Sequence, residues 1–233
     1  MTSAATPSPE RAARAATVRN SLGVGVAVGA YGFAFGAASV AAGLSVLQTC
    51  LLSLVAFTGG TQFAVVGVVA GGGTLAAALT SGLLLGSRNT LYAMRLAPLL
   101  KVRGLRRLLA ALGTIDESTA MAVGQGSDEQ ARVAFWWTFG GVFTFWNLST
   151  LLGAAGTSAL GDPTKFGLDA VIPAAFLALL APRVRGTARI ERRVAVGGAV
   201  IALVLIPLTP PGVPILAACA ALLLATTFTG VRR

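Results

Sequence analysis

Two adjacent carboxylates and one arginine are the side chains best suited by type to chemistry in this chain. Asp116 and Glu117 lie between two apolar runs, and Arg88 ends a long stretch without charge. Burial raises the pKa of a carboxyl group, whereas a nearby guanidinium lowers it. Because the chain contains no histidine, we expect Asp116 or Glu117 to carry a proton-coupled step, with Arg88 as the opposing charge. The alternative is a structural role, as a helix N-cap or an ion pair with Arg88.

A pair of glycines among polar residues is the second candidate region. Glycine pairs can unwind a membrane helix, and the freed amides and carbonyls can hold a carboxylate and an ammonium. We therefore expect a site for a zwitterionic solute, although the glycines could also merely kink the helix. The expected solute-binding residues are Thr58, Gly59, Gly60, Thr61, Gln62 and Phe63, together with Arg88 and Asn89.

The sequence gives no support for an enzyme. The lack of histidine excludes an HExxH zinc site and a Ser–His dyad, and no glycine-rich phosphate loop ending in Gly-Lys-Ser or Gly-Lys-Thr is present. Cys50 and Cys219 lie in apolar runs without a partner pattern. We therefore expect no catalytic residue, no metal and no cofactor.

The elements that must position these residues are long apolar segments. No charged residue occurs between Arg19 and Arg88, a stretch that would reach about 100 Å as one helix, or three crossings of a hydrocarbon core. Hydrophobic residues make up 55% of the chain and charged residues 11%. The sequence thus predicts an all-α, multi-pass protein of the cytoplasmic membrane. The net charge of +10 resides in clusters beside apolar segments, which indicates contact with membrane lipids rather than nucleic acid.

Seven spans are expected, within a single transmembrane domain over residues 20–233 that follows a disordered tail over residues 1–19. The first span is expected to be retained, although its basic start could also belong to a cleaved signal peptide. Interrupted segments in both halves favour a three-plus-three inverted repeat. Residues 101–130 are expected to form a surface-lying or partly inserted helix. The spans are Ser21–Ala42, Leu47–Ala70, Thr74–Ala97, Val133–Gly156, Phe166–Pro182, Val194–Leu208 and Val213–Gly230.

The basic clusters predict the orientation of these spans. Cytoplasmic loops are enriched in lysine and arginine, so residues 101–113 and 183–193 are expected in the cytoplasm. With seven spans the N-terminus then lies outside, which conflicts with the basic residues Arg11, Arg14 and Arg19.

A stripe of glycines marks the first span. Gly25, Gly29, Gly32 and Gly36 share one helix face. Without side chains at these positions another helix can approach closely, so we expect a tight helix–helix contact along this face.

Three segments, in order, resemble motifs of the AzlC family of branched-chain amino-acid permeases. They are FTGGTQF at 57–63, SRNTLYAMRLAP at 87–98 and TIDE at 114–117, with Asn89 where the family commonly has histidine. The resemblance implies proton-driven export of valine, leucine and isoleucine, with methionine as a further candidate. It also implies a small membrane partner subunit of the AzlD type. A passive small-solute channel and a non-transporting membrane scaffold are the alternatives.

Overall fold

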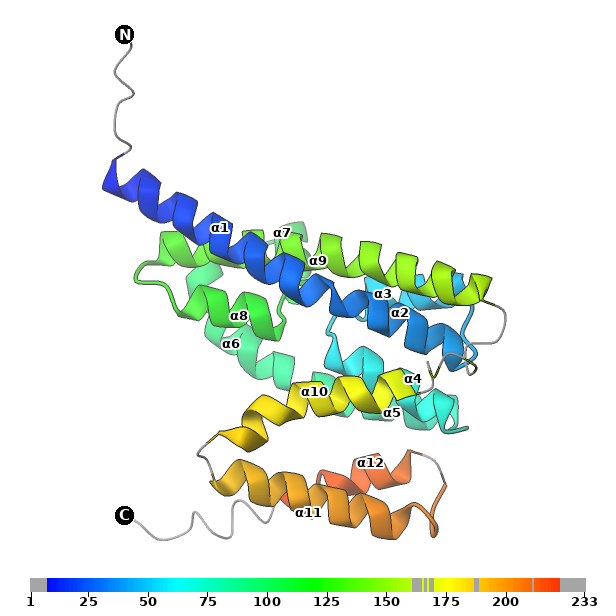
Figure 1. The fold of residues 1–233 in the computed structure, drawn as a ribbon. Coiled ribbons are helices and arrows are strands. Elements are labelled where there is room, and N and C mark those ends of the chain that lie inside the picture. Colours follow the sequence, from blue (N-terminus) through cyan, green and yellow to red (C-terminus); the bar gives the residue numbers. More distant parts are fainter. Residues whose placement is uncertain are drawn as a thin grey trace, which may run out of the picture.

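The computed structural model is built from α-helices, twelve of them in the part of the chain that it describes, and contains no strand in that part (Figure 1). The predicted all-α fold class is thereby confirmed. The described residues are 8–160, 165, 167, 170–186, 189–210 and 212–222.

A seam between the first two helices and the longest one organises the bundle. Helices α1 (Pro9–Gly29) and α2 (Tyr31–Ala41) run side by side with α9 (Asp128–Ala159) (Figure 1). A Cβ atom on Gly25 would lie 2.8 Å from the carbonyl carbon of Gly141. The predicted close approach along the glycine stripe is confirmed, and its partner is α9.

The seam also gives the bundle its direction. Ser21 contacts Ala134, whereas Gly36 contacts Thr150, so α1–α2 and α9 run parallel and begin at the same end. We call this the basic end, because it holds Arg11 and the other arginines of α1. The helix includes residues 9–19, which were expected in a disordered tail, whereas residues 1–7 lie outside the described part.

Helices α3 (Val46–Val55) and α4 (Gly60–Ala70) form a hairpin. Its tip reaches the interior, where the ring of Phe57 lies 5.0 Å from that of Phe143. Each helix, at about 1.5 Å per residue, extends only about 15 Å, which is half the hydrocarbon thickness of a bilayer. Between the two helices the chain reverses direction at Gly59, whose φ of +58° is readily adopted by glycine. The expected span Leu47–Ala70 therefore differs in the structure, because it enters and leaves at the end opposite the basic end.

Helices α5 (Leu75–Gly86) and α6 (Arg88–Leu100) run from that opposite end to the basic end. Gly82 of α5 lies against Val65 of α4, and these two helices run antiparallel. Beyond α6, Lys101 Nζ contacts Asp128 Oδ2 at 2.9 Å at the start of α9. This hydrogen bond from Lys101 lowers the pKa of Asp128.

A second hairpin opens at the basic end. It consists of α7 (Leu105–Leu112) and α8 (Asp116–Val123), and its tip residue Ile115 packs in one core cluster with Phe57 of the first hairpin. The expected partly inserted region over 101–130 thus contains two half-length helices. The two hairpins enter from opposite ends and meet in the middle of the bundle.

The remaining helices are α10 (Val171–Arg185), α11 (Arg189–Leu205) and α12 (Val213–Ala218). Phe176 of α10 packs on Phe63 of α4 with ring centroids 6.2 Å apart. The last turn of α10 and the first turn of α11 lie on the side where α1 begins (Figure 1). The ends of two expected spans, over 166, 168–169 and 223–230, lie outside the described residues.

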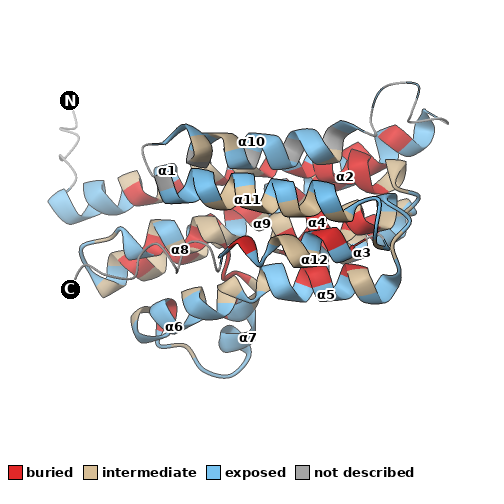
Figure 2. Cartoon of the chain, turned by 90° about the horizontal axis from the view of Figure 1, so that it is seen from below, coloured by how far each residue is buried: buried red, intermediate tan, exposed pale blue. Residues whose placement is uncertain are grey.

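Buried residues line the faces that the central helices turn toward one another, whereas the outer faces are exposed (Figure 2). Many exposed side chains are large and apolar, such as Leu47, Leu75 and Leu83. Among the described residues, only the helical stretch Pro9–Ala41 is both long and apolar enough to cross a bilayer by itself.

Candidate functional site

The candidate site lies where the two hairpins meet the middle of α5–α6. Arg88, the first residue of α6, places Nη1 2.9 Å from Oδ2 of Asp116, the first residue of α8. The two side chains are 29% and 37% exposed. The structure thus brings together the arginine and one of the two carboxylates that the sequence singles out.

The same guanidinium also approaches the first hairpin. Arg88 Nη2 lies 3.6 Å from the position that a Cβ atom would take on Gly60, the first residue of α4. Helices α4 and α8 therefore both begin beside Arg88 and run away from it toward opposite ends. Because helix N-termini carry partial positive charge, this half-helix junction, formed by Gly60, Arg88 and Asp116, favours anionic groups.

Several buried polar atoms around the junction have no hydrogen-bond partner among the described residues. An unsatisfied buried group costs about 1–3 kcal/mol, and such groups in a native structure call for an explanation such as a bound ligand or water. Their presence beside Arg88 and Asp116 makes the junction the candidate site for water or a polar ligand. The atoms are Thr61 Oγ1, Arg88 Nε, Asn89 Oδ1, Asp116 Oδ1 and Thr119 Oγ1.

Gln62, expected to contact solute, holds the arms of the first hairpin together. It is fully buried, and its Nε2 donates to the carbonyl oxygens of Leu52 at 3.4 Å and Ser53 at 3.2 Å. Both carbonyls belong to the last turn of α3, where helical amides become too few to satisfy every acceptor. The Leu52 carbonyl also accepts from the amide of Ala56 at 2.9 Å, so Gln62 matters most for Ser53. Ser53 Oγ in turn donates to Asn147 Oδ1 of α9 at 2.7 Å.

The other expected solute-binding residues surround the hairpin tip. Thr58 Oγ1 donates to the carbonyl of Ala56 at 3.3 Å, and Gly59 provides the positive φ described above. Phe63 is buried in the aromatic core. Glu117 follows Asp116 and forms no ion pair among the described residues, so the contact to Arg88 distinguishes the two carboxylates.

An apolar wall lies beside the charged junction and was not predicted from the sequence. Trp146 stacks on Phe35 with centroids 6.1 Å apart, and its ring lies 3.8 Å from a Cβ position on Gly59. Phe57 and Ile115, from the two hairpin tips, belong to the same core cluster. A polar residue within an apolar helix is a sequence signal that could have pointed to this part of α9. Asn147, directly after Trp146, is such a residue.

Comparison with known proteins gives a family and two relatives. A family model described as AzlC protein matches residues 23–160, which extend from α1 through α9. The chain is 28% identical to "Inner membrane protein YgaZ" of Escherichia coli over 190 residues, covering 75% of this chain and 76% of that protein. It is 32% identical to an "Uncharacterized membrane protein" of Archaeoglobus fulgidus over 191 residues, covering 81% and 83%. No solved structure matches.

Proposed function

Because the chain belongs to the AzlC family, we propose that this membrane protein is a secondary transporter of the cytoplasmic membrane that exports branched-chain and related hydrophobic amino acids. The observation that carries the proposal is the pairing of Arg88 with Asp116 where α4 and α8 begin. A separate small membrane subunit of the AzlD type is its proposed partner. Proton entry down the electrochemical gradient drives export.

Six membrane crossings and two re-entrant hairpins form the proposed topology. The crossings are α1–α2, α5–α6, α9, α10, α11 and the segment that begins with α12, whereas α3–α4 and α7–α8 enter from opposite faces. This arrangement leaves Arg11, Lys101 and Arg192 at one end, as the positive-inside rule requires of a cytoplasmic face. It removes the conflict of the seven-span arrangement, in which the arginines of α1 lie outside. The opposed hairpins are consistent with an inverted repeat.

The amino acid binds in the half-helix junction as a zwitterion. Its carboxylate contacts the Arg88 guanidinium and the first amides of α4, where positive charge converges. Its ammonium group contacts Asp116, which is the carboxylate of the junction. The apolar side chain lies against the wall formed by Phe57, Ile115 and Trp146, which favours branched aliphatic side chains over polar ones.

Competition between a proton and the substrate ammonium for Asp116 couples the two movements. On the cytoplasmic side the ionised carboxylate binds the ammonium group, and on the outer side a proton takes its place and releases the amino acid. The protonated carrier returns and loses its proton to the cytoplasm. Without substrate, the ionised Asp116 pairs with Arg88, as in the structure, and this pair limits uncoupled proton leak.

Transport by reconstituted protein tests the proposal. Asp116→Asn is expected to lose proton-driven valine export yet retain exchange of valine for valine at raised valine concentrations, because the amide oxygen can still accept from the ammonium group and exchange moves no net proton. Asp128→Asn, which removes an exposed carboxylate at the basic end, is the matched control and is expected to export normally. Normal uphill export by Asp116→Asn contradicts the coupling role. Valine flux that is insensitive to a protonophore indicates a passive channel, and no flux with the partner subunit present indicates a scaffold.

A further inference from the structure

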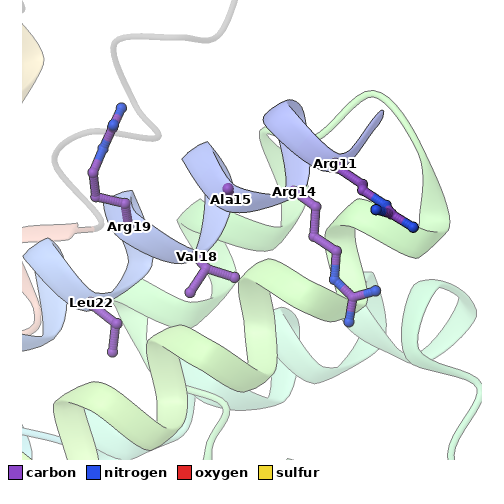
Figure 3. Close-up of a pocket in the computed structure, with 6 residues that line it drawn as sticks. All are labelled: Arg11, Arg14, Ala15, Val18, Arg19 and Leu22. Carbon is purple, nitrogen blue, oxygen red and sulfur yellow. The ribbon is translucent and has the colours of Figure 1, made fainter. Parts of the chain in front are cut away.

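A basic hollow runs along the first helix at the basic end. Its volume is about 540 Å³, and its lining residues recur at helical spacing on one face of α1 (Figure 3). Ala15, Val18 and Leu22 form an apolar floor, and Arg14 and Arg19 project on opposite sides of it (Figure 3). The hollow therefore combines cationic edges with an apolar base.

The arginines of this hollow have no anionic partner among the described residues. Arg11, Arg14 and Arg19 are exposed and form no ion pair there. Glu10, the nearest acidic residue in sequence, is not paired with them either. Arg11 and Arg14 project to one side of α1 and Arg19 to the other (Figure 3). Unpaired guanidinium groups along one hollow are electrostatically complementary to phosphate, which arginine binds through several N–H groups.

A second hollow continues the first along the seam between α1 and α9. Its volume is about 510 Å³, and it shares Leu22 with the basic hollow. Trp137 and Phe145 line it and are 46% and 39% exposed. Gly140 leaves it open, because no atom lies within 4 Å of a Cβ position there. This part offers an apolar track without charged residues.

The combined length matches one leaflet of a bilayer. Phe145 lies beside Gly29, and the helix from Arg14 to Gly29 rises about 22 Å at 1.5 Å per residue. Half of a bilayer, including its headgroup region, is also about 20–22 Å thick. The arginines thus lie at headgroup depth when Phe145 lies near the middle of the membrane.

We propose that these joined hollows bind one anionic phospholipid. The headgroup phosphate contacts Arg11 and Arg14, which project to the same side of α1 (Figure 3), with Arg19 adding positive charge at the other edge, and an acyl chain lies along Trp137, Gly140 and Phe145. Basic pockets on the cytoplasmic side of membrane helices are suited to anionic headgroups. The site concerns the α1–α9 seam and does not rest on the proposed transport function.

Thermal unfolding of the purified chain in neutral detergent tests the headgroup contact. A hundredfold excess of dioleoyl phosphatidylglycerol over its Kd is expected to raise Tm by roughly 5–10 °C, with a smaller effect of dioleoyl phosphatidylcholine. The triple variant Arg11→Gln, Arg14→Gln, Arg19→Gln is expected to lose this difference between lipids. The matched control replaces Arg103, Arg106 and Arg107, which are exposed at the same end, and is expected to keep it.

A second pair of variants tests the acyl-chain track. Gly140→Leu adds a side chain in the track, at a position where no atom lies within 4 Å of a Cβ atom, and is expected to weaken the phosphatidylglycerol effect at least tenfold in lipid concentration. Gly156→Leu, at an equally open position of α9, is expected to leave it unchanged. Phosphatidylglycerol with brominated chains is expected to quench the fluorescence of exposed Trp137 and, more weakly, of half-buried Trp136, which lines the same hollow. Trp137→Phe is expected to remove most of the quenching, since Trp146 is buried.

Three results overturn the proposal. The first is equal stabilisation by the two lipids in the wild-type chain. The second is unchanged lipid preference in the α1 triple variant, or an equal loss in its matched control. The third is a Gly140→Leu variant that responds to phosphatidylglycerol like the wild type, which leaves only diffuse attraction of a basic surface.

Discussion

Replacement of Gly36 by alanine tests the close approach between α2 and α9. The added Cβ atom would overlap the carbonyl oxygen of Thr150 and lie 2.8 Å from the amide nitrogen of Ala154. Both neighbours are backbone atoms of a helix, so no side chain can rotate away and the two helices must separate. Overpacking of this kind costs typically about 1–3 kcal/mol. For a chain of this size, that corresponds to a fall in Tm of roughly 2–12 °C.

The matched control is Gly23→Ala on the exposed face of α1. No atom lies within 4 Å of a Cβ position there, and alanine is favoured over glycine in a helix by about 0.5–1 kcal/mol. Gly23→Ala is therefore expected to keep or slightly raise Tm. Both variants are compared by thermal unfolding of the purified protein in the same detergent. If the Tm of Gly36→Ala equals that of Gly23→Ala, the helices are not in contact as the structure describes.

Three other predictions concern the hairpins and the basic end. Gln62→Leu is expected to lower stability by about 1–3 kcal/mol in the same thermal assay, because the buried Ser53 carbonyl at the end of α3 loses its side-chain donor, whereas Leu52 keeps the Ala56 amide; an unchanged Tm would argue against this cap. In a cysteine-free background, single cysteines at Leu44 and Gly71 are expected to react with impermeant reagents from the same face of the membrane. A cysteine at Arg103 is expected to react from the other face. Labelling of Leu44 and Gly71 from different faces would mean that α3–α4 crosses the membrane. Since the pKa of Asp128 is lowered, its ion pair stabilises the fold above the ordinary pKa, and this stability is lost as pH falls through the lowered one. Asp128→Asn is therefore expected to lower Tm slightly at pH 7 and to match the wild type in strong acid, and a difference that persists there would refute this origin.

The sequence predicts the helix seam better than the path of the chain. The spacing of Gly25, Gly29, Gly32 and Gly36 identifies a close-packing face, because helical periodicity is a local property. It does not identify α9 as the partner, since that choice depends on packing of segments more than 100 residues apart. Hydropathy likewise cannot distinguish one interrupted span from two half-length helices. The Gly59–Gly60 pair indicates a break, but only the positive φ of Gly59 shows a reversal.

For the candidate site as well, the residue types could be predicted from the sequence, whereas their arrangement in space could not. Residue types alone indicate an arginine and a carboxylate that oppose each other, and Arg88 and Asp116 do so. The sequence does not show which of Asp116 and Glu117 contacts Arg88, because this depends on the side of α8 that faces the start of α6. Gln62 illustrates the converse, because its amide has the chemistry of a solute ligand and yet its donor group satisfies the backbone of α3. Roles in transport remain predictions for all of these residues.

The tip-to-tip meeting of the two hairpins has an electrical consequence. In the proposed orientation, Asp116 lies near the middle of the bilayer, with one half-length hairpin between it and each aqueous phase. The transmembrane voltage then falls in two steps, one across each hairpin, and a proton that reaches Asp116 from outside has crossed only about half of it. At 100 mV a full crossing of one charge releases about 2.3 kcal/mol, so each step carries about 1.2 kcal/mol. Binding of the proton and its release into the cytoplasm would both be voltage-dependent, and neither step would use the whole field.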